Sequence, residues 1–145
     1  MKLTPLQGGR ERVSGFALIE VLVSAVVLGI GLLGLAALHT QSMQANHSAY
    51  LRSQAVNFTY DIADRMRANR SAALSGEYNI AIDATPSGGT LAGDDLVEWK
   101  TALAVSLPSG DGSVARDGDL FSITVQWDDS RGADPAQQFF IETQI

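Results

Sequence analysis

Glu20 is the residue whose type and position most need a chemical explanation, because it is the single charge in an apolar run from Phe16 to Leu38. An ionised carboxylate in hydrocarbon costs several kcal/mol unless it is paired. Such a residue normally marks a function and implies a positively charged partner. The run contains no basic residue, and Ser24 carries its single hydroxyl, so the run itself supplies no cation.

The other titratable residues form no catalytic or metal-binding pattern. His39 and His47 are eight residues apart, which does not match the i,i+4 spacing of two histidine ligands on a helix. The turns Asp117-Gly118-Asp119 and Asp128-Asp129 lack the full spacing of a calcium loop. The chain has no cysteine and no phosphate-binding or hydrolase motif. We therefore expect no enzyme, no cofactor and no metal site.

The apolar run is long enough to cross a membrane as a helix. Its 23 residues would span roughly 35 Å, against a hydrocarbon core of about 30 Å. The first 15 residues carry a net charge of +2, and the next basic residue after them is Arg52; the charges concerned are Lys2, Arg10, Glu11 and Arg12. The positive-inside rule then predicts a cytoplasmic N-terminus and a body beyond the membrane.

Two simpler interpretations of the run stay open at this point. The first is a secretory signal peptide, for which the run is long, although Gly34-Leu35-Ala36 resembles a weak cleavage site. The second is a plain signal anchor, in which Glu20 lies one turn into the span and reaches the lipid headgroups.

The sequence predicts that the same helix continues to Arg70. No proline or glycine occurs between His39 and Arg70. Apolar residues recur there on one helical face, namely Leu51, Ala55, Phe58, Ile62 and Met66. Two oppositely charged pairs have helical spacing on the wetter side, Asp61 with Arg65 and Asp64 with Arg67. We expect this half to pack into a globular domain and Ser71–Gly76 to end the helix.

The residues after Gly76 predict another helix. Alternating apolar residues indicate a short strand first, at Tyr78, Ile80 and Ile82. Residues 84–93 are rich in Gly, Pro and Ser and indicate a loop. Asp95 with Glu98 resembles a capping box. It precedes apolar residues at helical spacing and a stop at Pro108; these residues are Leu96, Trp99, Leu103 and Leu107.

The C-terminal third predicts antiparallel strands. Ser113–Arg116 and Leu120–Asp128 flank a hairpin turn at Asp117-Gly118. One face of the second strand is apolar and should be buried, through Phe121, Ile123, Val125 and Trp127. Gln138–Ile145 completes a sheet of three or four strands. The predicted fold class is therefore α+β, a long N-terminal helix packed against a small antiparallel sheet, with Trp99 and Trp127 in its core.

The charge of the chain argues against one class of partner. Its 145 residues include 10 basic and 16 acidic side chains, for a net charge of −6, and without the first 15 residues this becomes −8. Nucleic acid binding requires a basic face. We therefore expect no nucleic acid partner.

The start of the chain resembles the class III signal of type IV pilins and pseudopilins. The resemblance rests on Gly15, Phe16, Leu18, Glu20, Val21 and Leu22, with Ala17 where Thr or Ser is commoner. It implies that a membrane peptidase cuts after Gly15 and methylates the new amine of Phe16. It also implies that Glu20 pairs with the N-terminal amine of a neighbouring subunit, as an assembly residue.

Two further features of the apolar run concern its packing. Gly29, Gly31 and Gly34 either let neighbouring helices approach closely or loosen this helix. The helix-breaking proline that is common in major pilins would fall at Ala37 and is absent, which favours a minor subunit.

Residues 48–73, "SAYLRSQAVNFTYDIADRMRANRSAA", resemble the PilV family of minor pilins, and "EWKTALAVSLPSGDG" and "ITVQWDD" fit the same pattern. The resemblance implies a leader at 1–15, a transmembrane and filament-core helix at 16–38, an amphipathic helix at 39–75 and a periplasmic α+β part at 76–145.

The same resemblance implies a role and partners. The role is a minor pilin that primes pilus assembly near the tip, for twitching motility and adhesion. The partners are a prepilin peptidase, other minor pilins, the major pilin and a tip adhesin, first in the inner membrane and then in the pilus. A minor pseudopilin of a type II secretion system and a single-span inner-membrane protein of other function are the alternatives.

Overall fold

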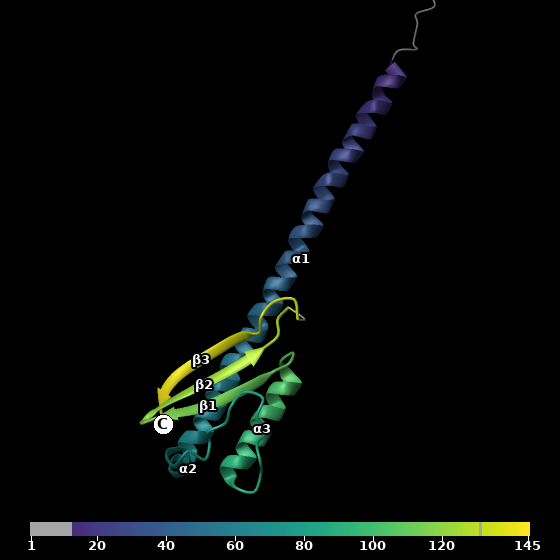
Figure 1. The fold of residues 1–145 in the computed structure, drawn as a ribbon. Helices are drawn as coiled ribbons and strands as arrows, with labels where there is room; N and C mark the ends of the chain where they lie inside the picture. The colour runs from purple at the N-terminus through teal and green to yellow at the C-terminus, as the bar shows by residue number, and fades with distance from the viewer. Residues whose placement is uncertain (1–12, 131) are drawn as a thin grey trace, which may run out of the picture. The chain divides into compact units, whose positions relative to one another are not determined.

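A computed structural model describes residues 13–130 and 132–145, with side chains from Phe16 onward. The predicted leader residues 1–12 lie outside the described residues. The described part contains, in chain order, α1 (Val13–Ala68), α2 (Arg70–Ser75), α3 (Leu91–Ser106), β1 (Asp111–Asp117), β2 (Leu120–Trp127) and β3 (Gln137–Gln144) (Figure 1). This composition confirms the predicted α+β class.

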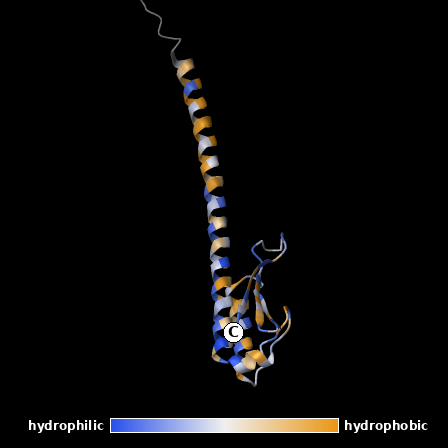
Figure 2. Ribbon diagram, turned by 90° about the vertical axis from the view of Figure 1, so that its left-hand side faces the viewer, coloured by the Kyte–Doolittle hydropathy of each residue, from blue (hydrophilic) through white to orange (hydrophobic). Residues whose placement is uncertain are grey.

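The chain divides into two compact units, Met1–Ala45 and Asn46–Ile145, and α1 contributes residues to both. Hydrophobic colouring predominates along the first half of α1 (Figure 2). In the second unit, the predicted apolar stripe of α1 is confirmed, because four of its five residues are buried and Phe58 is half-buried. This stripe shares one hydrophobic core with α3 and the sheet.

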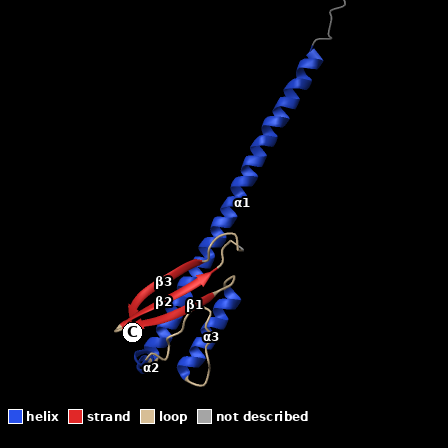
Figure 3. Cartoon of the chain, viewed as in Figure 1, coloured by secondary structure: helices blue, strands red, loops and turns tan. Residues whose placement is uncertain are grey.

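The sheet has three antiparallel strands in the order β1-β2-β3 (Figure 3). Asp117 pairs with Leu120, so the hairpin turn has two residues, and Gly118 has a φ of 61° there, as a tight hairpin turn favours. The face of β2 predicted to be buried is buried at all four positions, Phe121, Ile123, Val125 and Trp127. These side chains complete the core beside α1.

Helix α3 lies where its apolar spacing predicted it, but its start was predicted wrongly. The helix begins at Leu91, and Thr90 is its N-cap, accepting a hydrogen bond from the backbone N–H of Gly93 at 3.1 Å. Asp95 therefore lies inside the helix and forms no capping box with Glu98. Both carboxylates bind Arg65 of α1 instead. The indole of Trp99, buried as predicted, donates to the carbonyl of Phe58 at 2.9 Å.

The strand predicted at Tyr78, Ile80 and Ile82 is not formed. A single antiparallel bridge joins Ile80 to Val114, through two backbone hydrogen bonds of 2.9 Å. The chain then turns at Asp83, which has a φ of 62°. Lys100 binds the carbonyls on either side of this turn, and the carboxylate of Asp111 accepts from the N–H of Asp83.

The predicted helix to Arg70 consists of two helices. α1 ends at Ala68, where Arg65 and Arg67 place positive charge in its last turn. The segment Ser71–Gly76 was expected to end the helix, but its first five residues belong to α2. Gly76 is its C-cap with a φ of 85°, and backbone N–H groups there bond back to Ala72 and Ala73. The break lies at Asn69, which is the N-cap of α2 but makes no side-chain hydrogen bond to it.

Candidate functional site

The apolar half of α1 is the candidate site, because its side chains have no cover within the described chain. Every residue from Phe16 to Leu38 is exposed except Gly29, which is half-buried. Phe16, for example, is 79% exposed. By length and composition, α1 is the one helix of the described residues that could cross a membrane. Such a surface is stable in water only when lipid or protein covers it.

Glu20 lies on this surface, one helical turn after Phe16. Residues four apart share a helix face and are separated by about 6 Å along the axis. The carboxylate of Glu20 is exposed and makes no hydrogen bond or ion pair with any described residue. Gly15 and Phe16, the predicted cleavage pair, both lie within α1, which begins three residues before Phe16.

The three glycines of the run have open space around them. A Cβ atom built on Gly29, Gly31 or Gly34 would have no described atom within 4 Å, apart from the neighbouring helix backbone. Packing inside the subunit therefore gives no reason for glycine at these positions.

Comparison with known families decides what this surface belongs to. Residues 10–36 match the family described as prokaryotic N-terminal methylation motif, and residues 37–93 match the one described as type IV pilin Tt1218. The chain is a type IV pilin. The two matches adjoin and together run from the predicted leader into α3. No curated protein and no solved structure matches the chain.

Membership of this family has direct consequences for the pilin. Pilins are structural proteins, which confirms the prediction that the chain is not an enzyme. They are membrane-anchored, are processed by a prepilin peptidase and assemble with other pilins. The exposed apolar half of α1 fits the membrane anchor of such a pilin.

In the second unit of the pilin, Arg65 links α1 to α3. Its guanidinium contacts Glu98 at 2.7 Å and Asp95 and Asp61 at 3.2 Å each. The hydrogen bond to Glu98 raises the pKa of Arg65 and, in return, lowers the pKa of Glu98 below its usual value. The predicted pairs Asp61–Arg65 and Asp64–Arg67 are both present. The additional link to α3 was not predicted, since the partners are 30 and 33 residues apart.

Lys100 was also not singled out from the sequence. Its ammonium binds the carbonyls of Ala81 and Ala84 at 3.0 and 2.7 Å and pairs with Asp111 at 2.9 Å. Burial raises the pKa of Asp111, but hydrogen bonds from Lys100 and from backbone N–H groups outweigh it and lower the pKa overall. The available signal was its position between Trp99 and Leu103, on the buried side of α3.

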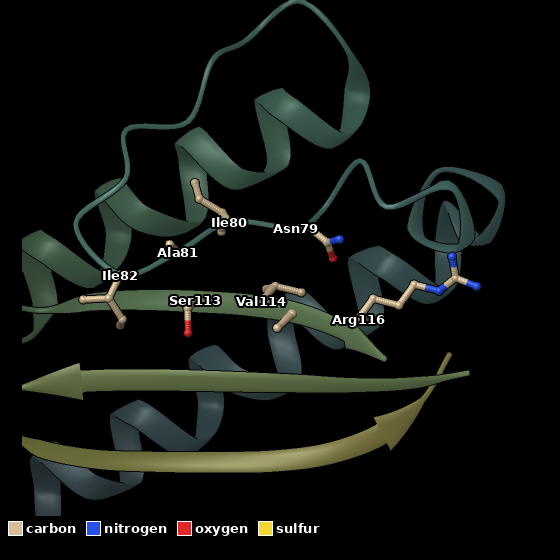
Figure 4. Close-up of a pocket in the computed structure, with 8 residues that line it drawn as sticks. Asn79, Ile80, Ala81, Ile82, Ser113, Val114 and Arg116 are labelled. Atoms are coloured by element: carbon tan, nitrogen blue, oxygen red, sulfur yellow. The ribbon is translucent and has the colours of Figure 1, made fainter. Parts of the chain in front are cut away.

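A shallow hollow of about 500 Å³ lies where residues 79–82 run beside β1 (Figure 4). Arg116 is its one titratable side chain, and this guanidinium is already bonded to the carbonyls of Gly118 and Leu74. His39 and His47 are exposed on α1. Among the residues described, no three His, Asp or Glu side chains gather where they could hold a metal ion.

Proposed function

We propose that this pilin is a minor pilin of the PilV type, which primes pilus assembly and enters the filament near its tip, for twitching motility and adhesion. The resemblance of residues 48–73 to that family supports the proposal, as does the absence of a helix-breaking proline at Ala37. The observation that carries it is Glu20, an exposed carboxylate without a described partner on an otherwise apolar helix.

Processing comes first in this proposal. The prepilin peptidase removes residues 1–15 by cutting between Gly15 and Phe16, and the new amine of Phe16 is methylated. Residues 16–38 span the inner membrane with the N-terminus in the cytoplasm, residues 39–75 continue as the amphipathic helix, and residues 76–145 lie in the periplasm. The basic residues before the run and their scarcity after it support this orientation.

Glu20 then selects the position of the subunit in the growing filament. The partner of its carboxylate is the positive N-terminal amine of Phe16 on a neighbouring subunit. In a low-dielectric helix bundle an unpaired carboxylate is unfavourable, so only the axial shift that pairs the two groups is stable. Gly29, Gly31 and Gly34 let the neighbouring helix approach closely, which is consistent with the open space around them.

The test begins with the N-terminus of the mature protein. Mass spectrometry of protein from the host should find a methylated Phe16 as the first residue. An intact Met1 would contradict the proposal at its first step, and would favour a plain single-span membrane protein.

The second part of the test concerns Glu20. We expect Glu20→Ala to leave processing and membrane insertion intact but to remove the subunit from sheared pili. The alanine has no charge to pair with the amine of Phe16 on a neighbouring subunit, so the correct axial position is no longer stabilised. Ser24→Ala, on the same run, is the matched control and should enter pili normally. Normal amounts of the Glu20→Ala protein in pili would refute the register role. Loss of protein secretion with normal twitching, on deletion of the gene, would favour a type II secretion pseudopilin.

A further inference from the structure

The two edges of the sheet are protected very differently. At the β1 edge, Ile80 exchanges two backbone hydrogen bonds with Val114, and the Asp111 carboxylate accepts from the N–H of Asp83 at 2.6 Å. Residues 79–82 thus cover this edge (Figure 4). At the β3 edge, the described residues form no bond between backbone groups other than the ladder to β2, and the hydroxyl of Thr143 donates to the carbonyl of Gln144 at 3.2 Å.

The register shows which backbone groups of β3 face outward. The backbone of Val114 bonds to Ile80, away from β2, so its partner Ile123 on β2 directs its own groups towards β3. Ile123 pairs with Ile141, and alternate residues face opposite edges. The outward N–H and C=O groups therefore belong to Gln138, Phe140, Glu142 and Gln144.

The β3 edge also lacks the usual features that prevent pairing. Its eight residues, "QQFFIETQ", contain no proline, lysine or glycine and pair with β2 in unbroken register. Glu142 is their single charge. Phe140 is 64% exposed in the middle of the strand, on the face away from the core. A strand added at this edge would place side chains about 5 Å from Phe140 and cover it.

We propose that the outer edge of β3 is a docking site for an extended strand of a different pilin subunit, which adds to the sheet as a fourth strand. Backbone hydrogen bonds to the four outward residues hold it. A basic side chain on the incoming strand faces Glu142. This inference rests on the proposed role in filament assembly and names the kind of neighbour involved.

Charge favours a different subunit over a second copy of this chain. Residues 46–145 contain 7 basic and 14 acidic side chains, a net charge of −7, so two copies of this unit repel. The strand β3 contains no basic residue to face Glu142 of a second copy. The edge of β1 is already covered by residues 79–82, so it is not a free strand to offer.

The experiment uses the full chain in cells that produce filaments. The photoreactive amino acid p-benzoylphenylalanine replaces Gln138, and adducts formed on irradiation are mapped by mass spectrometry. We expect an adduct with another pilin, located in an extended segment. The same probe at Val105, 82% exposed on α3, is the control for non-specific adducts.

Two changes at position 140 separate the backbone from the side chain. Phe140→Pro removes an outward N–H without removing a bond to β2, as proline is tolerated on that side of an edge strand. We expect it to reduce the adduct about tenfold, whereas Phe140→Ala should change it by about twofold or less. Glu142→Pro, with Glu142→Ala as its control, repeats the comparison at a second outward position. Circular dichroism of each purified variant confirms that the fold is retained.

The outcomes are distinct. No adduct, an adduct with a second copy of this chain, or an adduct equally strong with both proline variants would overturn the inference. Filament entry is measured separately by the amount of unmodified chain in sheared pili. A chain present in pili without an edge-dependent adduct refutes strand addition alone, while a chain absent from pili refutes the proposed function.

Discussion

Tyr78 illustrates at the scale of one residue how the globular unit is held together. Its phenol is fully buried, donates to Asp95 at 2.6 Å and accepts from the amide of Asn69 at 3.4 Å. Burial, followed by the hydrogen bond to Asp95, raises the pKa of Tyr78 to about 12. The folded state therefore keeps this phenol protonated at a pH where the unfolded chain ionises it.

This difference predicts an alkaline limit to stability. A raised folded-state pKa contributes stability that is complete below the unfolded pKa of about 10 and is lost as the pH rises from there to about 12. We expect Tyr78→Phe to reduce stability at pH 8 by about 1 kcal/mol, through the lost hydrogen bond. Above pH 10 its stability should decline less steeply than that of the wild type.

The measurement is urea unfolding of the full chain in detergent, at pH 8, 10 and 11, followed by the fluorescence of the buried tryptophans. Tyr60→Phe changes a tyrosine that is 53% exposed and should follow the wild type at every pH. Equal alkaline losses in Tyr78→Phe and the wild type would show that another group sets the limit.

At the scale of the element, the position of α3 was predicted correctly from the sequence, but its first residue was not. Its position followed from apolar residues at helical spacing, which is a local signal. Its start was misplaced because Asp95 and Glu98 have capping-box spacing, while their partner Arg65 is distant in sequence. The N-cap Thr90 was hidden in a Gly-rich loop, with Gly93 rather than Glu at the third helical position.

The cap yields a prediction for α3. Thr90→Ala removes the hydrogen bond to the N–H of Gly93, and we expect a loss of about 1 kcal/mol in the free energy of unfolding. Thr101→Ala is the matched control, because Thr101 is exposed inside the same helix and its hydroxyl bonds to the carbonyl of Val97. It should be neutral or slightly stabilising. Equal losses for the two variants in urea unfolding would argue against Thr90 as the cap.

The missing strand at residues 78–82 has a similar explanation. Its alternating apolar residues fit a strand, and Ile80 does bridge to β1. The side chains of Lys100 and Asp111 bind backbone groups around Asp83. The alternating pattern carries no information about these hydrogen bonds. Contacts between side chains and a remote backbone leave no periodic trace in the sequence. The hairpin of β1 and β2 was predictable because its turn and its alternation are both local.

At the scale of the whole molecule, the hydrophobic core belongs to one of the two units. Every buried hydrophobic residue of the described chain lies between Leu51 and Trp127. The family was predictable because the motif around Glu20 is short and contiguous. The open edge of β3 was not predictable, since it depends on which strand pairs with which.

A fragment tests whether this unit is independent. We expect residues 46–145 alone to be soluble without detergent and to unfold cooperatively, because they contain the whole core and the α1 stripe that completes it. Its tryptophan emission should match that of the full chain, with Trp99 and Trp127 buried in both. Aggregation, or emission typical of exposed indoles, would mean that the first 45 residues are needed for folding.

The continuity of α1 has a mechanical consequence. The helix that carries the apolar anchor also supplies the stripe from Leu51 to Met66, with no loop between them. A force applied to the N-terminal end of α1 would therefore act on the core residues through a helix and not through a flexible loop. Residues 39–47 are exposed on every side and have no packing to reinforce them, so we expect them to stretch first. Under force, this segment would unfold before the hydrophobic core does, and the core would stay folded.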